Sequence, residues 1–389
     1  MTATDLPTIE LNTDRLPGHP WIWSAQVRKP AQRLPPGSVV DIVDAGGRFV
    51  GRGFWNGHAR IALRLLTGDP RQAIDETFVA TRIARAVALR RDLLELDAAS
   101  DAWRVVHSEG DGLSGLVVDR YAGTLVIEYF AAGMWRLRDA VHAALLRHFP
   151  DATLYWFAEN HVQKQESFDC RPPEPPAPVE VHEHGLRFHA APGLGHKTGF
   201  FADQRDNRAR LALLARGKRV LDLCCNAGGF AVHAMAGGAE AAIGVDSDAG
   251  ILDIARANAA ANGVAVRFEQ ADVFDWLRAA IARGERHDVV VLDPPKLTRD
   301  RRQVTQALKK YFAMNRSALD VLAPGGLLLS CSCTGLVGDG EFLEMLRRVG
   351  LSAGRDIQVL HMGGAGADHP FLASVPEGRY LKAAFCRVD

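Results

Sequence analysis

The 389-residue sequence has no long apolar run and no net charge of either sign. Because no stretch of 18 or more residues is apolar throughout, we expect no segment that spans a membrane. The opening "MTATDLPTIELNTDRLPGHP" lacks the basic start and apolar core of a signal peptide, so we expect a cytoplasmic protein. The formal net charge of zero argues against a protein that coats nucleic acid non-specifically, since such proteins carry a strong basic excess.

Cysteine is also sparse, with six residues in the chain. Cytosolic thiols stay reduced, and a structural disulfide is therefore not expected. Two of the six, Cys331 and Cys333, stand one residue apart in "LLLSCSCTGL" (327–336), at the end of an apolar run that predicts a buried strand. A zinc site needs about four ligands and no second pair of ligands is near, so we expect no metal. Core packing and a nucleophilic thiol remain as interpretations of this pair.

Three regions of the chain differ in their pattern. Residues 1–70 combine short apolar alternations with the turn signals "DAGG" and "NG", which predicts a small β-rich domain. Its basic excess is modest: residues 11–71 hold nine Arg or Lys against four Asp or Glu. Residues 71–185 predict a central α+β domain that ends in a proline-rich connector, 170–185. Residues 186–389 alternate strand-like and helix-like segments.

This alternation predicts an α/β fold with a parallel, doubly wound sheet. The expected strands are 219–224, 241–245, 266–270, 287–292 and 326–332, with two further strands near 356–361 and 379–387. The expected helices are 228–236, 249–262, 273–283, 300–322 and 340–349.

The segment "VLDLCCNAGGFAVHA" (220–234) predicts a strand, a glycine-containing loop and a helix, and ligands of such sheets bind at this place. A dinucleotide site would show the spacing G-x-G-x-x-G, because a pyrophosphate must approach the backbone. Only the adjacent Gly228 and Gly229 are present. The loop therefore offers space without a phosphate cradle, which disfavours NAD and ATP.

Acidic residues follow the strands on either side of this loop. Asp246 ends the second strand, 24 residues after Asp222, where a carboxylate can accept both hydroxyls of a ribose. Asp272 follows the third strand and can accept the amino group of an adenine. A ribose acceptor, an adenine acceptor and no phosphate site together indicate S-adenosylmethionine. A single such Asp is often only a helix cap.

"LDPPKL" (292–297) closes the fourth strand. Pro294 and Pro295 predict a rigid, extended turn without backbone donors, which could press a flat base toward the cofactor and present Asp293 and Lys296 to its edge. The fifth strand should end beside it, at Cys331 and Cys333. A thiolate that adds to carbon 6 of a pyrimidine makes carbon 5 nucleophilic, so a thiol here suits methylation of that carbon.

Several motifs resemble one family over almost the whole chain. They are "GHPWIWSAQV" (18–27), "SEGDGLSGLVVDRY" (108–121), "GHKTGFFADQRDNR" (195–208), "SCTG" (332–335) and "ADHPFLASVPEGRYLKAAFCRV" (367–388). They resemble the bacterial 23S ribosomal RNA cytosine-5 methyltransferases of the large-subunit type. The resemblance implies a PUA-like RNA-binding domain (1–70), a central domain (71–185) and a Rossmann-like class I methyltransferase domain (186–389) with a seven-stranded, mostly parallel sheet. It implies 23S ribosomal RNA as the substrate, and it favours a homodimer.

The resemblance also assigns residues to the site. "SCTG" is similar to the family's S-C-S-G, which implies Cys333 as the nucleophile, with Asp293 holding the cytosine at N3 or its amine. Lys296 is the third residue of the expected catalytic group. It stands where other RNA cytosine-5 methyltransferases carry a second Cys. Because that Cys is missing here, the base that removes the carbon 5 proton is not identified. "LCCNAGG" departs from the usual Tyr-Thr-Gly-Gly loop. The residues expected at S-adenosylmethionine are Lys197, Thr198, Gly199, Phe200, Asp203, Arg205, Asp222, Cys224, Asn226, Gly228, Gly229, Phe230, Asp246, Ser247, Asp272, Val273, Asp293 and Pro294.

Three other functions stay open at this point. A guanine-N7 or amino-group methyltransferase would keep the cofactor and make Cys333 structural. An RNA-binding assembly factor would hold the cofactor without turnover. A nicotinamide-dependent oxidoreductase is disfavoured by the missing glycine spacing.

Overall fold

The structure, a computed structural model, describes residues 6–15, 18–193 and 200–389. The chain forms two compact units. The first unit comprises Met1–Val181, Ala190–Phe200 and Ala367–Gly378, and the second comprises His182–His189, Phe201–Gly366 and Arg379–Asp389. The division into three domains at residues 70 and 185 stays a prediction.

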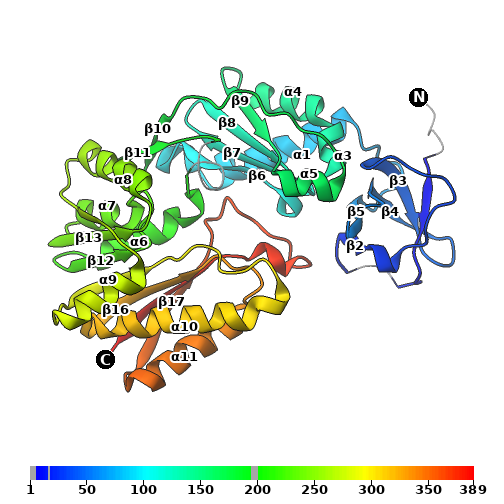
Figure 1. Cartoon of the computed structure of the whole chain (residues 1–389). Coiled ribbons are helices and arrows are strands. Elements are labelled where there is room, and N and C mark those ends of the chain that lie inside the picture. Colours follow the sequence, from blue (N-terminus) through cyan, green and yellow to red (C-terminus); the bar gives the residue numbers. More distant parts are fainter. Residues whose placement is uncertain (1–5, 16–17, 194–199) are drawn as a thin grey trace. The chain divides into compact units, whose positions relative to one another are not determined.

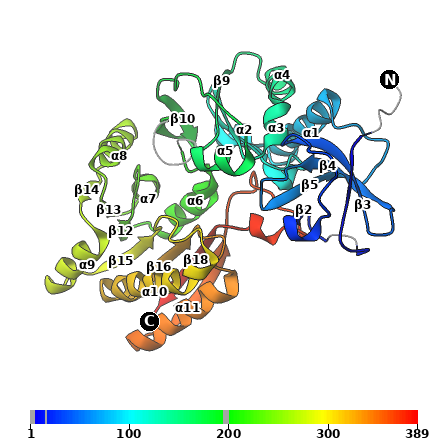
Figure 2. The ribbon, with the colours of Figure 1, turned by 45° about the vertical axis from the view of Figure 1, so that its right-hand side comes forward.

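The N-terminal part of the first unit is a small five-stranded sheet in the order β1-β3-β4-β5-β2 (Figures 1 and 2). Its strands are β1 (Thr8–Glu10), β2 (Trp21–Trp23), β3 (Ser38–Val43), β4 (Phe49–Trp55) and β5 (Ile61–Thr67). The expected turns "DAGG" and "NG" connect β3 to β4 and β4 to β5. Inward-facing side chains such as Val40, Ile42 and Leu63 form its core, so the expected β-rich domain is present.

The rest of the first unit is a four-stranded sheet, β6-β7-β8-β9, with helices packed against it. Helix α1 begins after Asp75, whose side chain caps the N–H of Phe78, and its apolar stripe, including Val79 and Ile83, is buried. The elements are α1 (Glu76–Ala88), α2 (Leu96–Ala99), β6 (Ala102–His107), β7 (Leu116–Tyr121), β8 (Thr124–Tyr129), α3 (Ala132–Arg136), α4 (Arg138–His148), β9 (Thr153–Phe157) and α5 (Asn160–Glu166).

The second unit contains a seven-stranded sheet in the order β14-β13-β12-β15-β16-β18-β17 (Figure 1). Only β18 runs antiparallel to its neighbours. The strands are β12 (Arg219–Leu223), β13 (Ala241–Asp246), β14 (Arg267–Gln270), β15 (His287–Leu292), β16 (Leu322–Ser332), β17 (Ile357–Gly363) and β18 (Lys382–Val388). The helices are α6 (Arg205–Leu214), α7 (Gly229–Ala236), α8 (Ala249–Ala261), α9 (Val273–Ala282), α10 (Val304–Asp320) and α11 (Asp339–Ala353). The predicted seven-stranded, mostly parallel sheet is confirmed.

Helices cover both faces of this sheet, because alternate strand residues are apolar on both sides. Leu221, Leu223 and Leu292 pack toward α9, α10 and α11. Val220 and Val291 pack with α6 and α7 on the opposite face. Such near-continuous apolar strands are typical of a parallel sheet buried on both faces.

The structure differs from the predicted elements at three places. Helix α10 begins at Val304, because Asp300 caps a separate 3-10 turn, Arg301–Gln303. Strand β16 begins four residues early, at Leu322, and its pairing with β15 is irregular between His287 and Val289. The end of the proline-rich connector forms β10 (Val179–Glu183), which pairs with β11 (Leu186–Ala190) in a two-stranded sheet.

The order of the parallel strands reverses between β12 and β15. In open α/β sheets, ligands bind outside the carboxyl ends of the strands at such a switch point. The ends of β12, β13, β14, β15 and β16 meet at this edge. Together with the loops and helix starts that follow them, they hold most of the residues that the sequence predicts for the site.

Candidate active site at the carboxyl ends of the parallel strands

Four carboxylates gather around Cys224, the first residue after β12. Burial raises the pKa of the Cys224 thiol, and the charges of four Asp residues raise it further. These are Asp246, Asp293, Asp222 and Asp272, one from each of four neighbouring strand ends. The structure therefore brings together the acidic residues that the strand spacing predicted, and their combined charge suits a cationic ligand.

Asp222 is fully buried within β12. One carboxylate oxygen accepts the N–H of Ala231 at 3.1 Å, while Oδ1 has no hydrogen-bond partner. Burial raises the pKa of Asp222 well above its ordinary value, and the nearby charges of Asp293 and Asp246 raise it further. A buried carboxylate oxygen without a partner is costly, and a cationic group bound at this edge would offset that cost.

The loop after β12 has an unusual backbone. Cys224, Asn226 and Gly228 have φ values of +59°, +49° and +76°. Left-handed conformations are strained for residues other than glycine, and such strain gathers at ligand sites. Asp246 holds the loop, because its Oδ2 accepts the N–H of Asn226 at 2.9 Å. A Cβ at Gly228 would lie 2.8 Å from the ring of Phe268, so this position requires glycine.

The other predicted residues near this loop have mixed surroundings. Asp272 is exposed and caps α9 by accepting the N–H groups of Phe274 and Asp275. Ser247 is exposed and Gly229 is half-buried. The side chains of Phe230 and Val273 belong to the two sheet cores, so only their backbone could face a ligand.

Asp293, directly after β15, is held by a residue that the motif analysis did not single out. Nε2 of Gln204 donates to Oδ2 of Asp293 at 2.9 Å, and Nδ2 of Asn207 donates to Oε1 of Gln204 at 2.6 Å. Gln204 stands inside "HKTGFFADQR", between Asp203 and Arg205, but sequence alone does not show which of these side chains turns toward Asp293. Pro294 is buried, and Lys296 is exposed.

The two thiols of "SCSC" have different surroundings. Cys331 lies within β16, has no exposed surface and packs in the sheet core with Leu329 and Phe385. Strand β16 ends at Ser332, so Cys333 lies beyond it and does not follow its alternation. Cys333 is half-buried, with Sγ 3.9 Å from the carbonyl oxygen of Pro294. Only Cys333 of this pair is therefore open to a substrate.

Hydrogen bonds fix the backbone on both sides of Cys333. Oγ of Ser332 donates to the hydroxyl of Tyr311 at 3.0 Å, and that hydroxyl lies 2.9 Å from Oγ1 of Thr334. Thr334 also accepts the N–H of Leu297, which ties the end of β16 to the turn after β15. Burial raises the pKa of Tyr311 to about 12, so the phenol stays neutral and can serve both hydroxyls.

The "HKTGFFADQR" segment is described only in part, and Lys197, Thr198 and Gly199 lie outside the described residues. Asp203 is buried and accepts the hydroxyl of Tyr380 at 2.6 Å. Arg205 is buried at the start of α6. Phe200 belongs to the first unit, where its carbonyl accepts the hydroxyl of Tyr121.

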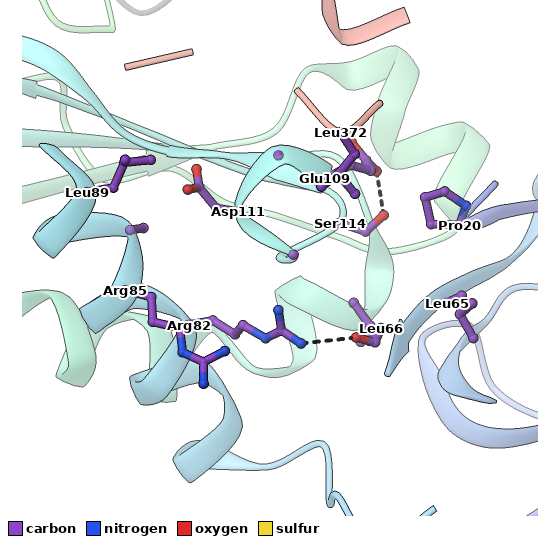
Figure 3. A pocket seen from close by; sticks show the side chains of 13 residues that line it. Pro20, Leu65, Leu66, Arg82, Arg85, Leu89, Glu109, Asp111, Ser114 and Leu372 are labelled. Carbon is purple, nitrogen blue, oxygen red and sulfur yellow. Dashed lines mark hydrogen bonds between the residues drawn. The ribbon is translucent and has the colours of Figure 1, made fainter. Parts of the chain in front are cut away.

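The first unit contains an open pocket of about 360 Å³ that none of the predicted site residues lines (Figure 3). Arg82 and Arg85 of α1 face it beside Glu109 and Asp111. The two acids are already engaged: Asp111 pairs with Arg90, and Glu109 accepts Trp21 Nε1 and the hydroxyl of Ser114. Among the described residues, neither Arg82 nor Arg85 forms an ion pair with a carboxylate, which leaves two cationic groups for a ligand.

Two classes of feature are not found in the part of the chain that the structure describes. No group of three or more His, Cys, Asp or Glu side chains is placed to hold a metal ion. Of the helices described, none has the length and apolar character needed to cross a bilayer.

Similarity to known proteins is extensive. The sequence profile described as S-adenosylmethionine-dependent methyltransferase matches residues 157–362, and one described as a PUA-like domain matches residues 15–68. The chain is 35% identical to ribosomal RNA large subunit methyltransferase I of Salmonella arizonae, over 100% of this chain and 99% of the relative. The proteins of the same name from Klebsiella pneumoniae and Photobacterium profundum are 36% and 37% identical, with 100% and 95% of each chain covered.

Solved structures show the same fold. A crystal structure of SMU.776 complexed with SAH has a TM-score of 0.84 at 20% identity, with 98% of this chain and 99% of that chain covered. A structure described as a SAM-dependent methyltransferase from Streptococcus mutans has a TM-score of 0.82 at 19% identity, with 98% and 100% covered. The predicted PUA-like domain, methyltransferase fold and S-adenosylmethionine cofactor are thus confirmed. The chain belongs to the S-adenosylmethionine-dependent methyltransferases and, among them, to the family of ribosomal RNA large subunit methyltransferase I.

Proposed function

We propose that this methyltransferase transfers a methyl group to carbon 5 of a cytosine in 23S ribosomal RNA, through a covalent bond between Cys333 and carbon 6. The ribosomal substrate follows from the names of its relatives. The observation that carries the reaction type is the half-buried thiol of Cys333, fixed against Pro294 at the strand edge where Asp293 also lies. The homodimer and the cytoplasmic location belong to the same proposal, and sedimentation of the purified protein tests the first.

S-adenosylmethionine supplies an electrophilic methyl group on a positively charged sulfur. The residues that would hold it are Asp222, Asp246, Asp272 and the glycine loop at Gly228. Their negative charge favours the sulfonium and amino groups, and the oxygen of Asp222 that has no protein partner gives one of them an acceptor.

The thiolate of Cys333 would form a bond to carbon 6, and the electron pair of the carbon 5–carbon 6 double bond would then attack the methyl carbon. Loss of the carbon 5 hydrogen as a proton restores the double bond and releases the thiolate. Asp293, held by Gln204, would accept a hydrogen bond from the exocyclic amine and, when protonated, donate one to N3, where negative charge develops. Such a contact is typically worth roughly 2.7–4 kcal/mol. Lys296 is exposed in the turn after β15. Its place in the catalytic group stays a prediction, and the base that removes the proton is not identified.

The first unit offers a contact for the RNA backbone. Arg82 and Arg85 line an open pocket and have no carboxylate ion pair among the described residues, and phosphate groups are the ligands that such guanidinium pairs bind. The double variant Arg82→Gln/Arg85→Gln should bind RNA more weakly. The slope of the logarithm of its binding constant against the logarithm of the salt concentration should be lower by about one per arginine. Arg278→Gln, which removes an exposed arginine of the second unit, is the control.

Methylation of unmodified 23S ribosomal RNA with labelled S-adenosylmethionine tests the reaction. The RNA is digested to nucleosides after incubation with wild type, Cys333→Ala or Cys331→Ala. We expect label in 5-methylcytidine, its loss with Cys333→Ala, and its retention with Cys331→Ala, which should cost only about 1 kcal/mol of stability. Label in a guanosine, or full activity without Cys333, would make Cys333 structural and favour the guanine-N7 or amino-group reaction.

A substrate that cannot finish the reaction tests the covalent step separately. RNA that contains 5-fluorocytosine has no proton to lose at carbon 5 after methyl transfer, so the bond between carbon 6 and the enzyme should persist. We expect a protein–RNA band that survives denaturation with wild type and is absent with Cys333→Ala. No band with wild type would contradict the covalent mechanism.

A further inference from the structure

A buried lysine lies beside the backbone that carries Cys333. Lys382 is the first residue of β18, and its partner in the antiparallel register with β16 is Ser332. Its Nζ donates to the carbonyl oxygen of Thr334 at 2.8 Å and to that of Tyr380 at 2.9 Å. Only 1% of the residue is exposed. Thr334 directly follows Cys333, so the lysine holds the turn in which the thiol stands.

This burial is costly for an ammonium group and calls for a reason. Two carbonyl oxygens accept from Nζ, and among the described residues Lys382 forms no ion pair with a carboxylate. A buried lysine without an anionic partner is rare, because desolvation disfavours its charged form. An apolar residue of similar length would avoid the cost of burying a charge, but it could not donate to the two carbonyl oxygens.

The charges that face Lys382 include the thiol. Burial lowers the pKa of Lys382 to about 8, while the charge of Asp339 and an anionic Cys333 each raise it. Lys296 and Arg379 act in the opposite direction. The interaction is reciprocal: if a thiolate at Cys333 stabilises the ammonium of Lys382, then the ammonium stabilises the thiolate equally.

We propose that Lys382 is a positioning residue that keeps Cys333 in its thiolate form and orients the turn that carries it. The thiol proton passes from Sγ to the neutral Nζ, directly or through solvent, which leaves a thiolate at Cys333 and an ammonium group at Lys382. The bond that breaks is S–H and the bond that forms is N–H, so no other reactant is needed. This inference rests on the proposed role of Cys333, since a thiol that only packs would need no such partner.

The thiolate fraction of Cys333 can be measured without RNA or cofactor. The full-length protein is alkylated with iodoacetamide between pH 5.5 and 10, and the rate at Cys333 is followed by mass spectrometry of its peptide. Cys170, Cys225, Cys331 and Cys386 are buried and should react far more slowly. The variants are Lys382→Met, which removes the charge and keeps the length, Lys382→Gln, which keeps a donor, and Lys382→Arg, which keeps a cation.

We expect Lys382→Met and Lys382→Gln to move the midpoint of the alkylation profile upward by at least about one pH unit, a roughly tenfold loss of thiolate near neutrality. Lys382→Arg should restore part of the shift. Arg379→Gln, which removes an exposed cation near Lys382, is the matched control and should leave the midpoint unchanged within about 0.3 units. The pH profile of kcat for Lys382→Met and Lys382→Gln should move in the same direction. If Lys382→Met does not fold, a comparison of the alkylation midpoints of Lys382→Gln and Lys382→Arg still separates the effect of charge from that of packing.

An unchanged midpoint in folded Lys382→Met or Lys382→Gln would overturn the inference, whatever the activity assay shows. The two proposals can fail separately. If Cys333→Ala keeps its activity while the midpoint still depends on Lys382, the covalent mechanism fails and the electrostatic pairing stands. If Cys333→Ala is inactive and the midpoint does not depend on Lys382, the mechanism stands and this inference fails.

Discussion

Gln204 Nε2 lies 2.9 Å from Asp293 Oδ2 and donates a hydrogen bond to it, across 89 residues of sequence. Gln204 stands just before α6, and Asp293 stands just after β15, so the contact joins two segments at the strand edge. It turns Oδ2 of Asp293 toward Gln204 and so fixes the orientation of the carboxylate at this edge. Gln204 is in turn fixed by Asn207.

Gln204→Leu should therefore lower kcat by about tenfold or more while changing the KM for RNA little. In the proposed mechanism Asp293 contacts the reacting ring, so its misorientation would affect the transition state more than binding. Gln204→Glu should be more severe, since a second carboxylate would repel Asp293. Steady-state kinetics with ribosomal RNA check both. Equal activity of the three proteins would exclude a role for this hydrogen bond.

Asp222→Asn should stabilise the protein without ligand and weaken cofactor binding. The folded-state pKa of Asp222 is raised well above the unfolded value, so its ionised form opposes folding, and stability falls as the pH rises through the folded pKa. The amide removes this cost, and we expect a gain in stability at neutral pH together with a loss of that pH dependence. Urea unfolding at pH 5 and pH 8 measures both effects.

The same Asp222→Asn variant should bind S-adenosylmethionine at least about tenfold more weakly, because a negative charge near the cationic ligand is lost. Isothermal titration checks this affinity. Asp253→Asn, an exposed substitution on α8, is the matched control and should change neither property. Lower stability together with unchanged affinity would contradict the assignment of Asp222 to the cofactor site.

Tyr311→Phe should lower activity more than its effect on stability explains. The substitution removes the hydroxyl that links Ser332 to Thr334, so each of these side chains loses one hydrogen-bond partner. We expect the free energy of unfolding to fall by about 1–3 kcal/mol. Because Cys333 stands between these two residues, the thiol should lose its fixed position. We expect a several-fold drop in kcat at temperatures where the variant is fully folded, measured beside a thermal unfolding curve. A drop in melting temperature with unchanged kcat would reduce Tyr311 to a packing residue.

A buried cluster behind α7 should make the protein sensitive to acid. Burial lowers the pKa of His233 to about 4, and its ring stacks on Phe188 with Nε2 3.3 Å from Glu183. Burial alone would raise the pKa of Glu183, but the charge and hydrogen bonds of Arg208, at 2.6 and 2.7 Å, hold it below its usual range. Both groups bind protons more readily in the unfolded chain.

Stability should therefore fall as the pH drops from about 6.5 toward 4, by up to about 3 kcal/mol from His233. His233→Phe keeps the stacking on Phe188 and removes the titrating group. Its stability should depend less on pH in this range than that of wild type, as measured by urea midpoints at pH 7.5 and pH 5. The same pH dependence in both proteins would show that other groups govern the acid response.

Local sequence patterns are sufficient to predict the architecture and the cofactor. The alternation of strands and helices, the missing phosphate cradle and an acidic residue at each of three strand ends are local patterns, and the parallel topology then places those ends at one edge. The motifs likewise predict the family from the residues alone. The boundaries of α10 and β16 do not follow from such patterns, because a capping Asp300 and an irregular pairing near Val289 decide them.

Which side chains at that edge can act depends on the tertiary structure. Cys331 and Cys333 look alike in sequence, but the end of β16 at Ser332 leaves one in the core and the other half-buried at the turn. The hydrogen bond of Gln204 to Asp293 and the contact of Lys382 with Thr334 each join segments that are far apart in the chain. No local pattern encodes such contacts, because burial and hydrogen-bond partners depend on how the strands and helices pack together.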